Sequence, residues 1–294
     1  MDHRRSFADG CSSDLHPTTL RRVVVGGSPT VGTRRSPRAG PHEESQMAWR
    51  VWQLAGPARS PRVNRHLAYH LAWTAGVLNS VGFVAVGFYT SHMTGITASV
   101  ADHLVLGGWA VVAIGLLALT TFVLGAMTSA LQFHWARRRE RWHDRRFALV
   151  LLTEAVLVLL IGALTDLGPG TERPWPLVAA LGYVMGLQNA LITKVSDATI
   201  RTTHVTGMVT DIGIELGKGV YRNRLEGSSP VRADLDRLRM HATLVGLFFL
   251  GGVMGALGYL AAGVVVLLVP AALLLTIAVP PLLSAPATPA PVRR

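Results

Sequence analysis

The sequence predicts an all-α membrane protein, with six transmembrane helices arranged as two inverted three-helix repeats, each containing a polar re-entrant or broken segment. Half of the 294 residues are hydrophobic, only 15% are charged, and the mean hydropathy is +0.37. A soluble domain of this length usually carries more charge. The apolar residues come in runs of about 20, the length that crosses a bilayer core of about 30 Å. The alternating segments typical of a transmembrane barrel are not visible.

The two ends of the chain lack such runs. Residues 1–64 are rich in Arg, Pro, Ser and Gly and show little periodicity, so we expect a disordered basic cytoplasmic tail. This tail contains no apolar core of a signal peptide, and the sequence leaves open whether translation starts at Met1 or at Met47. Cys11 is the single cysteine, which excludes a disulfide within the chain. Residues 286–294 form a second, short cytoplasmic tail.

Six apolar spans make up a predicted transmembrane domain over residues 65–285. We expect them at 67–89, 109–131, 148–164, 175–195, 242–261 and 264–283. Cytoplasmic loops of membrane proteins collect Lys and Arg. The net charge of +11 lies mostly between or before the spans, which favours membrane orientation over nucleic-acid binding. The basic connections at 133–146 and 217–241 and both termini are therefore assigned to the cytoplasm, and the neutral loop at 166–174 to the outside of an inner cell membrane.

Two polar motifs recur in the two halves of this domain. Gly76–Ser80 resembles Gly186–Ala190, and Ser91–Gly95 resembles Thr203–Gly207. Phe122-x-x-Gly125-x-Met127 in the second span also matches Phe249-x-x-Gly252-x-Met254 in the fifth. Repeat one covers 67–166 and repeat two 175–284. Their first spans run in opposite directions, so the repeats are inverted. We expect the polar segment at 91–103 to dip in from outside and that at 202–215 from the cytoplasm. Their Ser/Thr-rich starts could cap half-helices whose N-terminal ends face an anion.

These motifs also resemble those of a known family. Gly186-Leu187-Gln188-Asn189-Ala190, Arg201 to Gly207, Thr210 to Gly213, and Ser91 to Gly95 are similar to the signature of the YoaK-like bacterial membrane proteins. The resemblance covers about residues 67–285. Ile96 departs from it, because that family usually has Asn after the Thr-Gly pair. The resemblance implies a multi-spanning membrane protein of uncharacterised function, for which transport is the usual suspicion.

Inverted repeats with interrupted helices are typical of transporters, whose substrates bind where those interruptions meet. The favoured hypothesis is secondary transport of a small solute, with a proton as the candidate coupling ion. The expected partners are this solute and the lipid bilayer, without nucleic acid or cofactor. The candidate residues for substrate binding or a proton pathway are Asn79, His92, Thr94, Gly95, Gln188, Asn189, His204, Thr206, Gly207 and Asp211.

Other functions stay open. A channel would use the same polar segments as a filter, and a membrane scaffold or sensor would bind a partner through residues 1–64 or 217–241. We expect no enzyme, because no HExxH, Walker or nucleophile-elbow pattern is present. We also expect no metal site, because no pair of ligands has tight spacing.

Several candidate residues have a structural alternative. Each histidine could cap its own segment, and the amides of Asn79, Gln188 and Asn189 could bond neighbouring helices. Asp211 and Glu215 share a helix face. Glu215 is expected to pair with Lys218, while Asp211 is the functional candidate. Asp102 is either its counterpart, three residues out of register, or a residue that simply lies at the outer surface. Glu154 stands alone among Leu and Val, and at membrane depth it would have to be neutral or paired with a partner that the sequence does not identify. A surface position near the basic connector explains it more simply.

The glycines have structural roles in this interpretation. Gly182-x-x-x-Gly186 and Gly251-x-x-x-Gly255 allow close helix packing, either within one chain or in a homo-oligomer.

Overall fold

A computed structural model describes residues 54–56, 60–164, 175–195, 202–222 and 229–283. Over these residues it is helical, without strands, so the predicted all-α class is confirmed. The tail expected at 1–64 lies outside the described residues except for 54–56 and 60–64, and the tail at 286–294 lies wholly outside them.

The helices follow the predicted segments closely. Their bounds are α2 Pro61–Val86, α3 Met93–Leu106, α4 Trp109–Arg137, α5 Glu140–His143, α6 Arg146–Leu164, α7 Trp175–Val195, α8 Val205–Val220, α9 Leu235–Ala262, the 3-10 helix η2 Gly263–Leu267, and α10 Leu268–Leu283. The bounds of α7 agree with the fourth predicted span. The basic connector is shorter than expected, because α4 continues to Arg137 and α5 occupies part of the remainder.

Four segments of the described residues are long and apolar enough to cross a membrane: 109–137, 146–163, 175–195 and 235–283. The last is 49 residues long and contains α9, η2 and α10. Helix α2 is 26 residues long but is not among the four, because His70, Asn79 and Ser80 lower its hydropathy. A membrane protein is therefore supported, while the count of six crossing helices stays a prediction.

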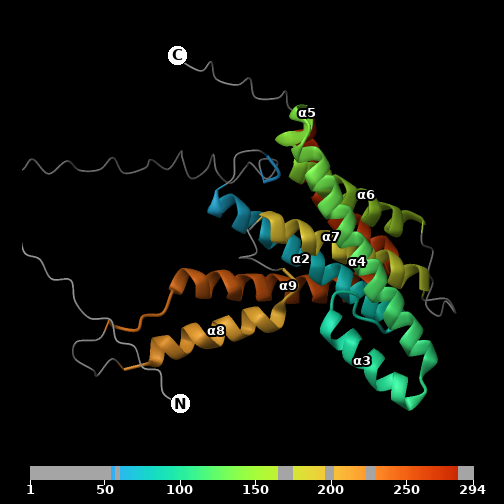
Figure 1. Cartoon of the computed structure of the whole chain (residues 1–294), viewed down its shortest axis with the longest axis horizontal. Coiled ribbons are helices and arrows are strands. Elements are labelled where there is room, and N and C mark those ends of the chain that lie inside the picture. The colour runs from blue at the N-terminus through green and yellow to red at the C-terminus, as the bar shows by residue number, and fades with distance from the viewer. Residues whose placement is uncertain (1–53, 57–59, 165–174, 196–201, 223–228, 284–294) are drawn as a thin grey trace, which may run out of the picture. The chain divides into compact units, whose positions relative to one another are not determined.

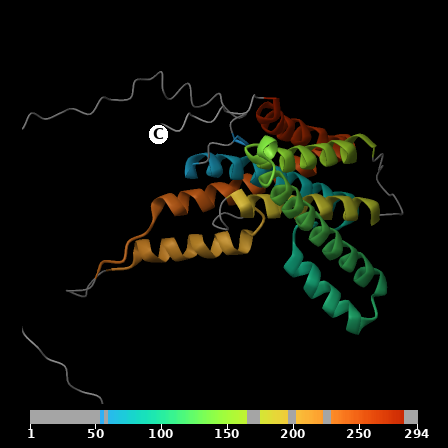
Figure 2. The same cartoon turned by 45° about the horizontal axis from the view of Figure 1, so that its top comes forward.

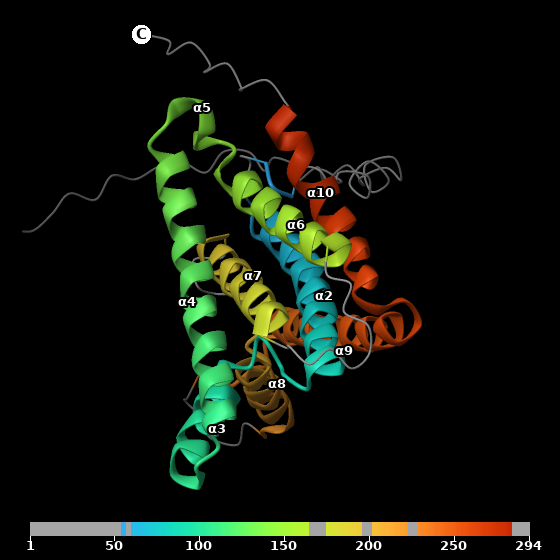
Figure 3. The same ribbon diagram turned by 90° about the vertical axis from the view of Figure 1, so that its right-hand side faces the viewer.

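The helices pack in three long pairs. α2 packs along α9, α4 along α7, and α6 along α10, and Figure 3 shows α6 and α10 side by side. α2 and α7 also contact one another and bury most of their large side chains, including Leu71, Leu78, Leu181, Leu187 and Leu191. α4 and α9 instead expose large apolar side chains, among them Val123, Leu124, Met127, Phe249 and Met254. Exposed apolar faces of this kind suit contact with lipid.

The two polar segments form short helices rather than loops. α3 has 14 residues and α8 has 16, and both are too short to cross a bilayer core of about 30 Å. α3 packs on α4 and α8 packs on α9, as Figures 1 and 2 show. We call α3 and α8 the half-helices. The loop predicted at 217–241 is correspondingly shorter, since α8 continues to Val220 and α9 begins at Leu235.

Candidate functional site

The pairs α2/α9 and α7/α4 cross through the same set of backbone contacts. A β-carbon added to Gly76 of α2 would lie 2.1 Å from the carbonyl oxygen of Phe248, and one added to Gly251 would lie 2.2 Å from that of Trp73. Each glycine therefore lets the other helix approach its backbone closely. Small residues at helix crossings permit this approach in membrane proteins.

The α7/α4 crossing repeats this reciprocal pattern. A β-carbon at Gly186 would lie 1.9 Å from the Phe122 carbonyl oxygen, and one at Gly125 would lie 1.9 Å from that of Tyr183. In both crossings the second glycine follows the phenylalanine by three residues. The aromatic residues that these second glycines contact, Trp73 and Tyr183, each precede the first glycine of their crossing by three residues.

These contacts correct one sequence match. The Phe-x-x-Gly spacing pairs Gly125 with Gly252, whereas the contacts place Gly251 in the position that corresponds to Gly125. Phe248 then corresponds to Phe122. The sequence match was wrong by one residue because α9 carries two adjacent phenylalanines and two adjacent glycines, and only packing selects which of each pair faces α2.

Each half-helix is attached to its long helix by an asparagine. The side-chain oxygen of Asn79 in α2 accepts hydrogen bonds from Ser91 N at 3.1 Å and from Ser91 Oγ at 2.8 Å. In α7, Asn189 Oδ1 accepts one from Thr203 Oγ1. The Ser/Thr-rich starts of the two polar segments were expected to cap the half-helices. The hydroxyls of Ser91 and Thr203 bond the asparagines instead.

The histidines lie at the N-caps of the half-helices, without a side-chain capping bond. The ring of His92 lies over Gly95, where an added β-carbon would be 2.1 Å from its Cδ2. His204 lies over Gly207 in the same way, 2.1 Å from its Nδ1. Both histidines are exposed, as are Thr94 and Thr206. The His-x-Thr-Gly pattern thus builds a turn in which glycine leaves room for the imidazole ring.

The carboxylates of α8 face α9. Asp211 Oδ2 accepts a hydrogen bond from Arg237 at 3.3 Å and lies 3.7 Å from His241 Nδ1. Asp102, its suggested counterpart, is exposed on α3. Asp211 therefore joins α8 to α9 through Arg237 and His241, and its role in substrate binding or a proton pathway stays a prediction.

Glu215 has a similar role one turn later in α8. It accepts hydrogen bonds from Lys218 at 2.9 Å and from the backbone N–H of Asp234 at 2.8 Å. The bond from the Lys218 ammonium, followed by that from the Asp234 N–H, holds the pKa of the Glu215 carboxyl below its usual range. The expected pairing with Lys218 is present, and the contact with Asp234 adds an anchor to the start of α9.

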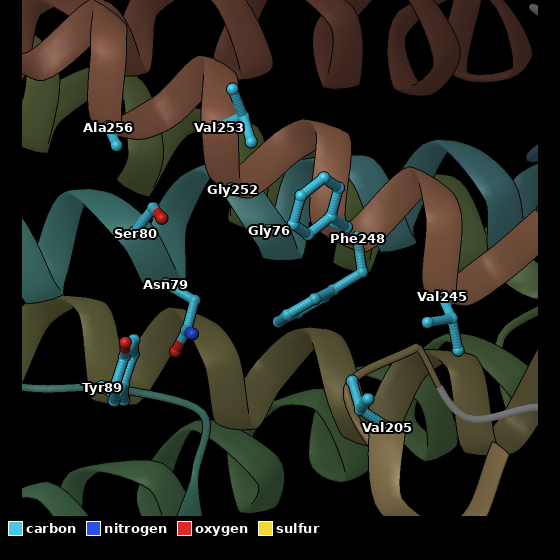
Figure 4. Close-up of a pocket in the computed structure, with 11 residues that line it drawn as sticks. Gly76, Asn79, Ser80, Tyr89, Val205, Val245, Phe248, Gly252, Val253 and Ala256 are labelled. Atoms are coloured by element: carbon cyan, nitrogen blue, oxygen red, sulfur yellow. The ribbon is translucent and has the colours of Figure 1, made fainter. Parts of the chain in front are cut away.

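A cavity of about 470 Å³ lies between α2 and α9, beside the start of α8. The side chains of Asn79 and Phe248 extend into it (Figure 4). Of the residues predicted to bind substrate, only Asn79 lines this cavity; the others do not. It is lined by Gly76, Asn79, Ser80, Tyr89, Val205, Val245, Phe248, Phe249, Gly252, Val253 and Ala256. The aromatic and aliphatic residues of α9 were missed because their sequence pattern is that of any apolar span.

Two further polar residues lie inside the helix bundle. Gln188 is fully buried and donates from Nε2 to the Leu71 carbonyl oxygen at 3.2 Å. Its side-chain amide therefore bonds the neighbouring helix α2, as the structural alternative expected. Glu154 is also fully buried, in the middle of α6. The surface position expected for Glu154 is wrong: residues of α7 cover the face of α6 on which it lies.

No group of three or more His, Cys, Asp or Glu side chains in the described ranges is arranged to hold a metal ion. No curated protein and no solved structure matches the chain at a significant level. A family model described as a protein of unknown function, DUF1275, matches residues 67–280. The resemblance to YoaK-like proteins is compatible with this match and stays a prediction. The chain belongs to the DUF1275 family, whose function is unknown.

Proposed function

We propose that this protein is a secondary transporter of a small solute in the inner cell membrane and that it has no enzymatic activity. The observation that carries the proposal is the recurrence of one structural unit in both halves. In each half, a long helix with a glycine crossing carries an asparagine that bonds a hydroxyl-bearing residue just before a half-helix. Two such units with opposite orientations would give a protein two equivalent gates.

The inverted arrangement is part of this proposal. Repeat one would contain α2, α3, α4 and α6, and repeat two α7, α8, α9 and α10. The pairing of helices supports it, because exchanging the repeats converts the α2/α9 pair into the α7/α4 pair and the α3/α4 pair into the α8/α9 pair. The basic connection at 133–146 and the basic termini favour cytoplasmic ends for the chain.

The cavity beside Asn79 is the candidate binding site. Asn79 uses its oxygen to hold Ser91, which leaves its Nδ2 group as a donor toward a solute. The other lining side chains are mainly aliphatic and aromatic. We infer a small, largely apolar solute that carries one hydrogen-bond acceptor. A site at a helix crossing can change access when the two helices rock against one another.

The test is ligand-dependent thermal stability of the full-length protein in detergent, with solutes of this class as probes. A solute at 100 times its dissociation constant adds about 2.7 kcal/mol to stability. The variant Gly252→Leu fills the cavity, because a β-carbon at Gly252 meets no atom closer than 3.4 Å. Gly213→Leu is the matched control, since nothing lies within 4 Å of its β-carbon position on α8.

We expect a solute that raises the melting temperature of the wild type and of Gly213→Leu but not that of Gly252→Leu. The same solute should show saturable uptake into vesicles that contain the wild type. Uptake that does not saturate, together with single-channel currents, would assign the protein to the channels. Equal stabilisation of both variants would remove the cavity from the proposal.

A further inference from the structure

The carboxyl group of Glu154 lies where no described hydrogen-bond donor or cation stabilises a negative charge. Its side chain is fully buried, and neither Oε1 nor Oε2 has a hydrogen-bond partner among the described residues. The residue lies in the middle of an apolar segment, 146–163, that is long enough to cross a membrane. At that depth no bulk water reaches the group. Ionisable residues in this situation usually mark a path for ions or protons.

The polar neighbour of Glu154 is Gln188 of α7. One of the two N–H donors on Nε2 of Gln188 is used, because it bonds the Leu71 carbonyl oxygen. Its Oε1 atom is buried and has no donor. Two neighbouring side chains therefore carry three buried oxygens, two on Glu154 and one on Gln188, and none of the three accepts a hydrogen bond within the described residues.

No described charged side chain forms an ion pair with Glu154. Four elements pack against α6: α4, α7, η2 and α10. η2 and α10 contain no titratable residue. α7 contributes Tyr183, whose hydroxyl donates to Thr128, and Lys194, which is exposed. In α4 the titratable residues, His134 and Arg137, are exposed near its C-terminal end.

We propose that Glu154 is a proton-binding site whose bound proton is shared with Gln188. One proton on the carboxyl group converts an acceptor oxygen into an O–H donor. This donor can bond Gln188 Oε1, so a single proton satisfies two of the unpartnered oxygens and removes the buried charge. A hard metal cation usually takes six or more oxygen ligands, and the three oxygens here fit a proton better.

This site is separate from the cavity beside Asn79, and it does not require that the protein transports a solute. In the proposed transporter, the proton on Glu154 would be the coupling ion, and that additional step rests on the proposed function. Gln188 would then connect the proton to α2, which also lines the cavity, through its bond to Leu71.

The test is infrared spectroscopy of the full-length protein in lipid vesicles at neutral pH. A protonated carboxylic acid gives a C=O stretching band that a carboxylate lacks. We expect this band in the wild type, its loss in Glu154→Gln, and its retention in the matched control Glu140→Gln, which changes an exposed residue of α5. Glu154→Gln keeps the shape and an N–H donor toward Gln188, so its melting temperature should stay close to that of the wild type.

A second variant tests the shared hydrogen bond. Gln188→Leu removes the acceptor, and we expect the band to shift to higher frequency because the acid O–H loses its partner. A wild type without the band at neutral pH, or a band that persists in Glu154→Gln, would overturn the proposal. Loss of the wild-type band when sodium replaces an organic cation at constant ionic strength would assign the site to a metal ion instead. None of these readings depends on solute uptake, so failure of the transport proposal would be seen separately.

Discussion

The two half-helices begin in the same way and pack against their neighbours differently. α3 and α8 both follow a turn in which a hydroxyl bonds a buried or half-buried asparagine and a histidine lies over a glycine. Beyond that turn, α3 rests on α4 through Ile96 and Val100. A β-carbon at Gly115 of α4 would lie only 2.4 Å from Val100 Cγ2, so this interface is apolar and tightly packed.

The α8/α9 interface includes charged groups in addition to the buried Met208. Asp211 and Glu215 project from one face of α8 toward Arg237 and the start of α9. Apolar packing does not respond to pH, whereas an interface held by carboxylates does. The turn motif thus determines where a half-helix begins. The residues after the motif determine how strongly the half-helix binds its neighbour and whether that binding depends on pH.

The largest effect is expected at the crossings that support both turns. Gly76→Ala and Gly186→Ala would each push a β-carbon against a backbone carbonyl, at 2.1 Å from Phe248 O and 1.9 Å from Phe122 O. Since backbone cannot rotate away as a side chain does, we expect a loss of about 3 kcal/mol or more in each case. Thermal unfolding in detergent measures this loss of stability.

Gly213→Ala is the control for these substitutions, because its β-carbon meets nothing within 4 Å and alanine favours helices by about 1 kcal/mol over glycine. Similar losses at Gly76 and Gly186 would support equivalent roles in the two halves. An unchanged melting temperature for either variant would show that the two helices of that crossing lie farther apart than in the structure.

The next effect separates the two turns. Asn79→Ala removes the acceptor of two hydrogen bonds, and Asn189→Ala removes the acceptor of one. Leaving a buried donor without a partner costs about 1–3 kcal/mol, so Asn79→Ala should destabilise the protein more than Asn189→Ala does. The measurement is the difference in melting temperature between the two variants. The reverse order would mean that the turn before α8 has the greater structural importance.

A pH titration should distinguish the half-helices themselves. The pKa of Glu215 is lowered from 4.5 by its bonds to Lys218 and the Asp234 N–H. A lowered pKa in the folded state means that these bonds contribute stability above pH 4.5, and that the contribution is lost as the pH falls through the lowered value. α8 should therefore loosen from α9 in acid, while α3 stays on α4.

Distances between paired spin labels can follow both helices in a Cys11→Ser background. Labels at Gly213 and Ala242 report on α8, and labels at Ala101 and Ala113 report on α3; all four positions are exposed. The α8 distances should broaden below pH 4.5, and Glu215→Gln should show the same broadening at neutral pH. Equal broadening for α3 would contradict the assignment of different packing forces.

The smallest effect is expected at the glycines beneath the histidines. Gly95→Ala and Gly207→Ala would place a β-carbon 2.1 Å from the imidazole of His92 or His204. Both rings are exposed and can rotate into solvent. The change should therefore lie within about 1 kcal/mol of zero, because the helix propensity of alanine offsets the displacement of the ring. Chemical modification of each histidine should become faster, and an unchanged rate would show that the ring keeps its place.

The sequence by itself determined the membrane character, the bounds of α7 and the positions of the two half-helices. These features depend on local hydropathy and on short motifs such as His-x-Thr-Gly, which need no knowledge of neighbouring helices. The sequence also predicted the Glu215–Lys218 pair of α8, because these two residues lie three apart on one helix.

Only the tertiary structure decided which face of each span is inside. It selected Gly251 over Gly252 as the counterpart of Gly125, placed Glu154 against Gln188 within the bundle, and formed a cavity around Asn79. The physical reason is that lipid is about as apolar as a leucine side chain. An apolar span therefore has nearly the same composition on its protein-facing and lipid-facing sides, and the rotation of each helix is set by close packing and by a few buried hydrogen bonds.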